Sequence, residues 1–249
     1  MNKSLKKYFP VFVLPTLIAF IIAFVAPFIM GVGLSFTKFT TVTNAQFVGL
    51  DNYIKIFTDP NHDFLNALIF TTLFTIVSII TVNIIAFSLA MLLTRKMKGT
   101  NFFRSVFFLP NLIGGIVLGY IWQLLINGVL DMLVNSDITK SSTYGFWGLV
   151  ILNNWQLIGY MMVIYIAGIQ NIPGDLIEAA AIDGASKTKT LFKITIPMVM
   201  PSITICMFLT LTNSFKMFDQ NLALTGGAPG KSTQITAFAC PTPAHPILP

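Results

Sequence analysis

The chain has 249 residues, of which 55% are hydrophobic and 10% charged, and its 15 lysines and arginines outnumber 9 aspartates and glutamates. Soluble domains carry roughly 25% charged residues, so the composition excludes an ordinary soluble domain and indicates an integral membrane protein. In such a protein the formal net charge of +6 is explained by basic loops that fix orientation, which argues against nucleic-acid binding.

Five uncharged, apolar intervals are long enough to cross a bilayer, which takes about 20 helical residues. They predict an all-α, polytopic helical bundle with a short N-terminal segment (1–10), a first transmembrane helix (11–36) and a membrane core (64–239). Within the core we expect spans at about 64–94, 105–126, 147–169 and 196–215. The first apolar run is longer than a signal-peptide core of about 7–15 residues, so we expect it to be retained.

The placement of basic residues predicts the orientation of these spans. With a cytoplasmic N-terminus, ten of the 15 lysines and arginines fall on the cytoplasmic side, as the positive-inside rule favours. These ten are Lys3, Lys6, Lys7, Arg95, Lys96, Lys98, Arg104, Lys187, Lys189 and Lys193.

The last ten residues, 240–249, differ sharply from the rest. Proline occupies four of the nine positions from Pro241 to Pro249, and such a segment cannot continue a helix. We expect this tail to be aberrant, either out of register with the original gene or the result of truncation, and we expect a sixth span to be missing.

A polar segment, 174–197, separates the last two predicted spans and contains Glu178, the one glutamate of the chain. Asp175 and Glu178 have the spacing of a capping box, and the alanines after Glu178 favour a helix. Gly184 fits the left-handed position just beyond a helix end. We therefore expect a short helix, a turn and a re-entry helix near Pro197. From these residues alone, it remains equally open that Glu178 does nothing more than cap its own helix.

The same segment resembles the EAA loop of the membrane subunits of binding-protein-dependent ABC importers. The resemblance rests on Glu178-Ala179-Ala180, on Gly184 six residues beyond Glu178, and on Ile194 and Pro197. It differs slightly at Ile196, where many members of that family have leucine.

This resemblance implies that the segment is a coupling helix that docks on a cytoplasmic ATPase subunit. The expected coupling residues are Glu178, Ala179, Ala180, Asp183 and Gly184. The chain has no Gly-x-x-x-x-Gly-Lys-Ser/Thr motif of its own, so we expect ATP to be used by the partner subunit and no cofactor to be bound directly. A second homologous permease subunit, an extracytoplasmic solute-binding protein and a location in the bacterial plasma membrane are further implications.

Other stretches resemble the carbohydrate-uptake branch of this family, of the maltose and glycerol-phosphate type, and imply a carbohydrate substrate. They are Val48–Tyr53, Arg104–Pro110, Gly168–Pro173, Asp183 before Gly184, and Leu224–Gly230. In the last of these, Gly226, Gly227 and Pro229 are expected to face the solute-binding protein. An ordinary turn between spans would explain them equally well.

Polar side chains inside spans either line a pathway or hold helices together. Asn153, Tyr160 and Asn213 are the candidates for the substrate pathway, and Asn83 is interpreted as a link between helices. An ion-coupled transporter would need ionisable groups within the predicted spans, and an intramembrane enzyme would need a catalytic or metal-binding cluster. The sequence offers neither, so no catalytic and no metal site is predicted.

Overall fold

The computed structural model describes residues 3–39, 44–58, 63–95 and 98–239. These residues divide into two compact units, one that precedes Asp63 and one that begins with it. Five helical segments among the described residues are long and apolar enough to cross a membrane, which confirms the predicted all-α bundle of five spans. They are Val13–Ser35, Asp63–Leu93, Gly115–Val134, Ser142–Gln170 and Lys187–Phe215. The tail predicted to be aberrant, 240–249, lies outside the described residues.

The first unit consists of one long apolar helical run and a small hairpin with a helix. Its elements are α1 (Lys3–Phe20), η1 (Ile21–Val25), α2 (Ala26–Ser35), β1 (Thr37–Phe39), β2 (Ala45–Phe47) and α3 (Asp51–Thr58). β1 and β2 are antiparallel, with Thr37 opposite Phe47. The Asn52 amide donates to the carbonyls of Ser35 (2.9 Å) and Thr37 (3.0 Å), so the Val48–Tyr53 stretch fixes the chain after α2.

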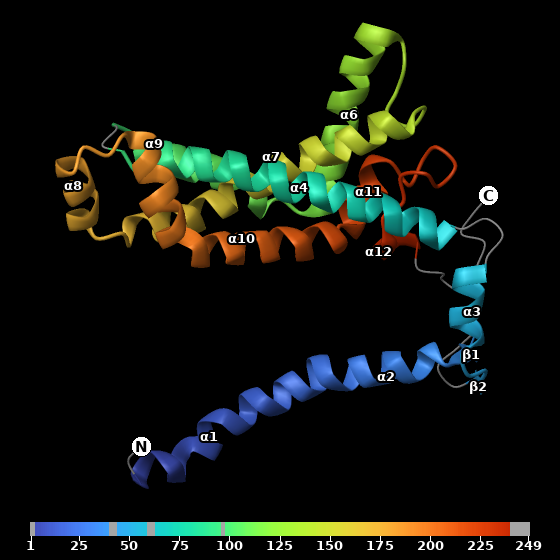
Figure 1. Ribbon diagram of the computed structural model, residues 1–249. Helices are drawn as coiled ribbons and strands as arrows, with labels where there is room; N and C mark the ends of the chain where they lie inside the picture. The colour runs from blue at the N-terminus through green and yellow to red at the C-terminus, as the bar shows by residue number, and fades with distance from the viewer. Residues whose placement is uncertain (1–2, 40–43, 59–62, 96–97, 240–249) are drawn as a thin grey trace. The chain divides into compact units, whose positions relative to one another are not determined.

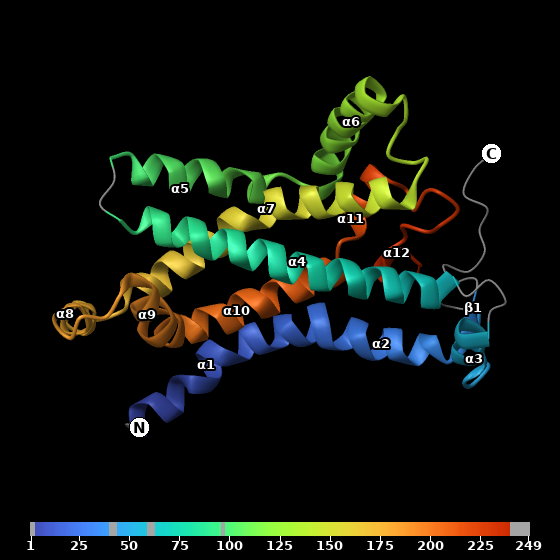
Figure 2. The ribbon, with the colours of Figure 1, turned by 45° about the horizontal axis from the view of Figure 1, so that its top comes forward.

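The second unit is a helical bundle (Figure 1). Its elements are α4 (Asp63–Leu93), α5 (Thr100–Phe108), η2 (Leu109–Leu112), α6 (Gly115–Val134), α7 (Ser142–Gln170), α8 (Gly174–Ile182), α9 (Lys187–Thr190), η3 (Leu191–Thr195), α10 (Ile196–Phe215), α11 (Phe218–Leu224) and α12 (Thr236–Ala239). Figures 1 and 2 show α4 and α10 side by side along the bundle.

The core of this unit lies where α4, α7 and α10 meet. Near their starts Phe74 of α4 contacts Phe146 of α7, and near their ends Phe87 contacts Tyr165, so these two helices run parallel. α10 runs the opposite way. Buried residues of all three helices form one apolar cluster, including Val82, Ala86, Leu157, Met161, Val199 and Cys206.

The third span differs from its prediction, because the apolar stretch 105–126 is broken into two helices. Pro110, in η2, has no backbone N–H to continue α5. Gly114 then has an extended backbone, and α6 begins at Gly115 and continues to Val134. The span therefore carries an aspartate, Asp131, in its last turns, which the predicted boundary had placed outside.

The re-entry helix also begins earlier than predicted, at Lys187 rather than near Pro197. Ser186 caps it, because its hydroxyl accepts from the amide of Lys189. The π-helical turn Leu191–Thr195 comes directly before Pro197. A π turn relaxes the hydrogen-bond ladder at the point where proline offers no donor, so the helix continues through it.

Small residues let the helices of the bundle approach closely, as is common in membranes. Gly159 of α7 lies directly against the backbone of Phe107, so a Cβ at this position would overlap with the Phe107 carbonyl. By contrast, Gly128 of α6 has open space where its Cβ would be. Both glycines lie within helices, and they therefore form a matched pair.

We predict that Gly159→Ala destabilises the protein by about 1–3 kcal/mol, because backbone atoms cannot rotate away from the added methyl group. Thermal unfolding of the detergent-solubilised protein would show a lower midpoint.

Gly128→Ala is the control, and it should leave the midpoint unchanged or raise it, since alanine favours a helix by roughly 1 kcal/mol over glycine. Equal midpoints for the two variants would contradict the close packing of α5 on α7.

Candidate functional site

The polar segment after α7 forms a short helix, α8, as predicted, but the predicted capping box is wrong. α8 begins one residue earlier, at Gly174, with Pro173 as its N-cap and no side chain capping it. Asp175 and Glu178 both lie inside the helix. The fixed geometry of Ile172-Pro173 ends α7 and starts α8 without a side-chain acceptor. Glu178 is exposed and does not cap the helix, so capping does not account for this residue.

The end of α8 agrees with its prediction. Gly184 has φ +71°, a left-handed conformation that glycine adopts readily. Its amide donates to Ala181 O at 3.1 Å, and the Ala185 amide donates to Ala180 O at 2.9 Å. This pair of bonds is a Schellman motif, and it turns the chain sharply toward Ser186 and α9.

α8 presents both acidic and apolar groups on its surface. Four of the five predicted coupling residues are exposed, namely Glu178, Ala179, Asp183 and Gly184. Ala180 differs, because it is buried against the rest of the protein. Ile182, at the end of the helix, is 87% exposed. Leu176 and Ile177 of α8 are exposed as well, so the short helix carries several apolar side chains beside its carboxylates, and another protein could cover this surface.

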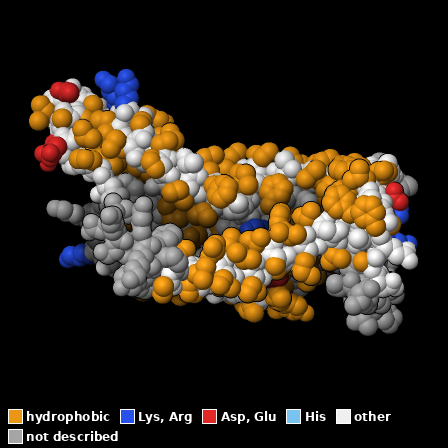
Figure 3. All heavy atoms as spheres, turned by 90° about the horizontal axis from the view of Figure 1, so that it is seen from below, with side chains coloured by type: hydrophobic (Ala, Val, Ile, Leu, Met, Phe, Trp, Pro, Cys, Tyr) orange, Lys and Arg blue, Asp and Glu red, His pale blue; other side chains and the backbone are white. Residues whose placement is uncertain are grey.

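Basic residues follow directly. Lys187, Lys189 and Lys193 are all exposed on α9 and η3. In the face seen in Figure 3, hydrophobic side chains cover the helices along most of their length. Acidic and basic side chains gather at the end of the bundle that carries α8. Apolar sides and a charged end are typical of a membrane-spanning bundle.

The three candidate pathway residues do not share one environment. Asn153 is 3% exposed within α7, and its amide nitrogen is buried without a hydrogen-bond partner. Tyr160, two turns further along, is half-buried and lies edge-on to Phe108, with ring centroids 6.4 Å apart. Asn213 of α10 is exposed, and its amide donates to Leu209 O at 2.8 Å. Of the three, Asn213 is the one on the surface of the bundle.

Other polar groups inside the spans hold helices together. The Tyr165 hydroxyl donates to Asn83 Oδ1 at 2.7 Å and so joins α7 to α4, as predicted for Asn83. Gln220 of α11 donates to Gln156 of α7 at 3.0 Å. Each such bond is worth about 0.6 kcal/mol on average, so these pairs set helix positions more than overall stability.

The glycine-rich loop after α11 is held firmly in place. Gly226 and Gly227 have positive φ, and Pro229 follows a cis peptide bond. The Asn221 side chain, fully buried, donates to Thr233 O at 2.8 Å and accepts from the Ile235 amide at 3.3 Å. The loop is therefore more than a flexible connection.

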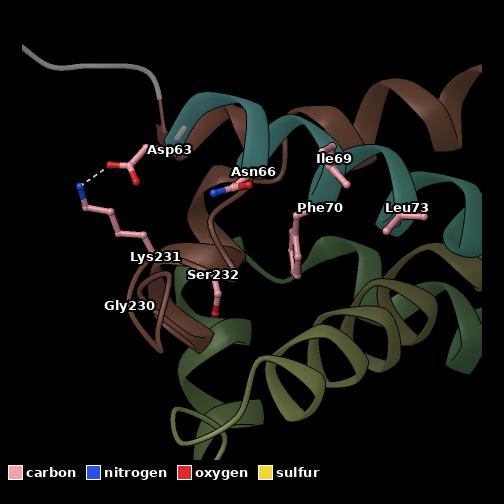
Figure 4. Close-up of a pocket in the computed structure, with 8 residues that line it drawn as sticks. All are labelled: Asp63, Asn66, Ile69, Phe70, Leu73, Gly230, Lys231 and Ser232. Atoms are coloured by element: carbon pink, nitrogen blue, oxygen red, sulfur yellow. Dashed lines mark hydrogen bonds and ion pairs between the residues drawn. The ribbon is translucent and has the colours of Figure 1, made fainter. Parts of the chain in front are cut away.

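Sequence reasoning missed the partner of this loop, which is the start of α4. Lys231 Nζ lies 2.7 Å from Asp63 Oδ2, and the Thr236 amide donates to Thr71 Oγ1 at 2.8 Å. Figure 4 shows this ion pair at the rim of a pocket between the two segments. A lysine in a glycine-rich loop and an aspartate flanking a span were the available signals, but their 168-residue separation hid the pairing.

No group of three or more histidine, cysteine, aspartate or glutamate side chains that could hold a metal occurs among the described residues. Three places are therefore the candidates for a functional site: the exposed helix α8, the surface of α10 at Asn213, and the loop 225–235 at the end of the bundle opposite α8.

Comparison with known proteins identifies the chain's relatives. The family described as "Binding-protein-dependent transport system inner membrane component" matches residues 87–238, which include α7, α8 and α10. The chain is 46% identical to the probable starch degradation products transport system permease protein AmyD of Thermoanaerobacterium thermosulfurigenes, over 90% of this chain and 78% of that protein. It is 32% identical to the multiple sugar-binding transport system permease protein MsmF of Streptococcus mutans, over 94% and 83%.

Solved structures show the same fold. A bacterial ABC transporter involved in the import of the acidic polysaccharide alginate has a chain that superposes with a TM-score of 0.77 at 20% identity, covering 95% of this chain and 84% of that one. From the family match and the similarity to AmyD together, the chain belongs to the binding-protein-dependent transport system inner membrane component family.

Proposed function

We propose that the chain is the membrane-spanning permease subunit of an ATP-driven ABC importer for a carbohydrate in the bacterial plasma membrane. The observation that carries the mechanism is α8, an exposed helix with free acidic side chains and an exposed isoleucine at one polar end of the bundle. The carbohydrate class is supported by relatives named for starch degradation products and multiple sugars.

In this proposal α8 inserts into a cleft of a separate cytoplasmic ATPase. Ile182 supplies apolar contact, and Glu178 pairs with a basic side chain of the ATPase in a charge-assisted hydrogen bond. α8 follows α7 directly and leads through the Gly184 turn into the helix that contains α10. Movement of the ATPase would therefore reach two core helices at once and drive alternating access.

The pathway itself requires a second permease subunit. Asn213 lies on the surface of α10, where a polar side chain within a span is costly unless a partner or a water-filled cavity faces it. The loop with Gly226, Gly227 and Pro229 would face the solute-binding protein at the other end. The N-terminus is then cytoplasmic, on the same side as α8.

We predict that charge reversal at Glu178 uncouples the importer. Glu178→Lys should reduce co-purification of the ATPase and sugar uptake by about tenfold or more, as loss of a charge-assisted contact and the resulting repulsion would cause. Membrane insertion should be unchanged. Lys140→Glu, an exposed charge reversal in the loop that precedes α7 at the end opposite α8, is the control; equal losses in both variants would argue against a specific role for α8.

The turn after α8 gives a second prediction. Gly184→Val should lower uptake, because a β-branched residue is strained by roughly 1–2 kcal/mol or more at positive φ and the Schellman turn would open. Gly174→Ala is its control, since Gly174 also has open space beside it but no positive φ. Uptake by Gly184→Val at the wild-type rate would mean that the turn does not position α8.

The orientation is testable by cysteine labelling on a background without Cys206 and Cys240. Ser186 and Ser232 are both exposed and lie at opposite ends of the bundle. We expect a membrane-impermeant maleimide to label Ser232→Cys in intact spheroplasts and Ser186→Cys only after permeabilisation. The reverse pattern would invert the proposed topology.

A further inference from the structure

The pocket at the start of α4 lies at the end of the bundle opposite α8. α4 and α7 run parallel, and α8 follows the end of α7, so the first residues of α4 are at the far end (Figure 1). If α8 faces the cytoplasm, as the proposed function holds, this pocket opens toward the solute-binding protein. A solute entering the membrane would meet this end first.

Two segments form the walls of the pocket. Asp63, Asn66, Phe70 and neighbouring apolar residues come from the first turns of α4, and Gly230, Lys231 and Ser232 come from the loop (Figure 4). Its volume of about 340 Å³ is at the lower end of the range for small-molecule sites, about 300–1,000 Å³. That space suits one sugar ring with its water rather than a long oligosaccharide.

The loop side of the pocket is fixed before any ligand arrives. The Thr233 hydroxyl donates to Ala228 O at 2.6 Å, and the Ser232 hydroxyl donates to Pro229 O at 2.7 Å. The Thr236 hydroxyl also bonds Thr71 Oγ1 at 2.9 Å, which ties the end of the loop to α4. A wall built this way loses little freedom when a solute binds, which favours affinity.

The chemistry of the lining is mixed but electrically balanced. The Lys231 ammonium is a donor and the Asp63 carboxylate an acceptor, and they neutralise each other at 2.7 Å. An asparagine such as Asn66 carries both donor and acceptor atoms, and the Ser232 hydroxyl, whose proton is donated to Pro229 O, can still accept. The ring of Phe70 is held by Phe146, edge-on with centroids 5.6 Å apart, so its position is set.

These features match a neutral polyhydroxyl ring. Its hydroxyls both donate and accept, as the lining does, and its C–H face can contact an aromatic ring. A phosphorylated or acidic sugar would instead have to separate Lys231 from Asp63 and leave a carboxylate facing its own negative charge. We propose that the pocket is an entry subsite for one ring of a neutral sugar, a conclusion that rests on the proposed function.

Protection of a cysteine at the rim tests this subsite. Ser232→Cys would be introduced into a cysteine-free permease assembled with its ATPase, its second permease and lipid, without the binding protein. Maltose, trehalose or maltotriose at millimolar concentration should slow alkylation of the introduced thiol by a small thiol reagent at least about threefold. Glucose 6-phosphate should not slow it. A bound ring blocks access to the thiol, whereas docking of another protein plays no part in this assay.

Removing the ion pair should remove the protection. Asp63→Ala with Lys231→Ala would abolish it, while Asp137→Ala with Lys140→Ala would leave it intact. The second pair is the matched control, because Lys140 and Asp137 form an ion pair (3.4 Å) in the loop between α6 and α7, outside the pocket. Their side chains are 61% and 36% exposed, close to the 61% and 33% of Lys231 and Asp63.

An unchanged alkylation rate with all three neutral sugars would overturn the subsite. Equal protection by glucose 6-phosphate would overturn its preference for neutral rings. Uptake of the same sugars by the full importer with its binding protein distinguishes a failure of the subsite from a failure of the proposed function. Uptake without protection of the cysteine refutes the subsite alone. If no carbohydrate is taken up, the proposed function is refuted as well.

Discussion

The contact among α4, α7 and α10 is the constraint on which the other features depend. In a bilayer, apolar burial does not drive helices together, so close approach and a few interhelical hydrogen bonds must do so. Gly168 of α7 lies against Ser202 of α10, and Asn83 of α4 bonds Tyr165 of α7. Because these three helices are fixed to one another, the displacement of α8 that the proposed function requires would be transmitted along the bundle.

The two polar ends of the bundle are built on different principles. α8 is short, capped by no side chain at its start and attached through turns at Pro173 and Gly184, so it can be exposed without distorting α7. The loop 225–235 is instead tied inward by buried Asn221 and Thr233. The first arrangement suits the proposed contact of α8 with another protein, and the second suits the proposed contact of the loop with a solute.

Much of this architecture can be predicted from the sequence, because the bilayer restricts which structures can cross it. Long uncharged runs must be helices, which explains why five spans were predicted and found. Gly184 was placed correctly because a helix end needs a left-handed residue there. The predicted capping box was wrong because Pro173 already sets the start of α8. The capping-box pattern considers only the spacing of Asp175 and Glu178, so it does not take the preceding proline into account.

What the sequence could not predict depends on contacts between distant residues. Asn153 and Asn213 look alike in an apolar run, yet one is buried against neighbouring helices and the other lies on the surface. Asp63 and Lys231 each flank a different segment, and an exposed ion pair of this kind contributes only about 0–1 kcal/mol to stability. Such a pair is a weak brace but a ready source of one donor and one acceptor, which favours a role in recognition over a role in folding.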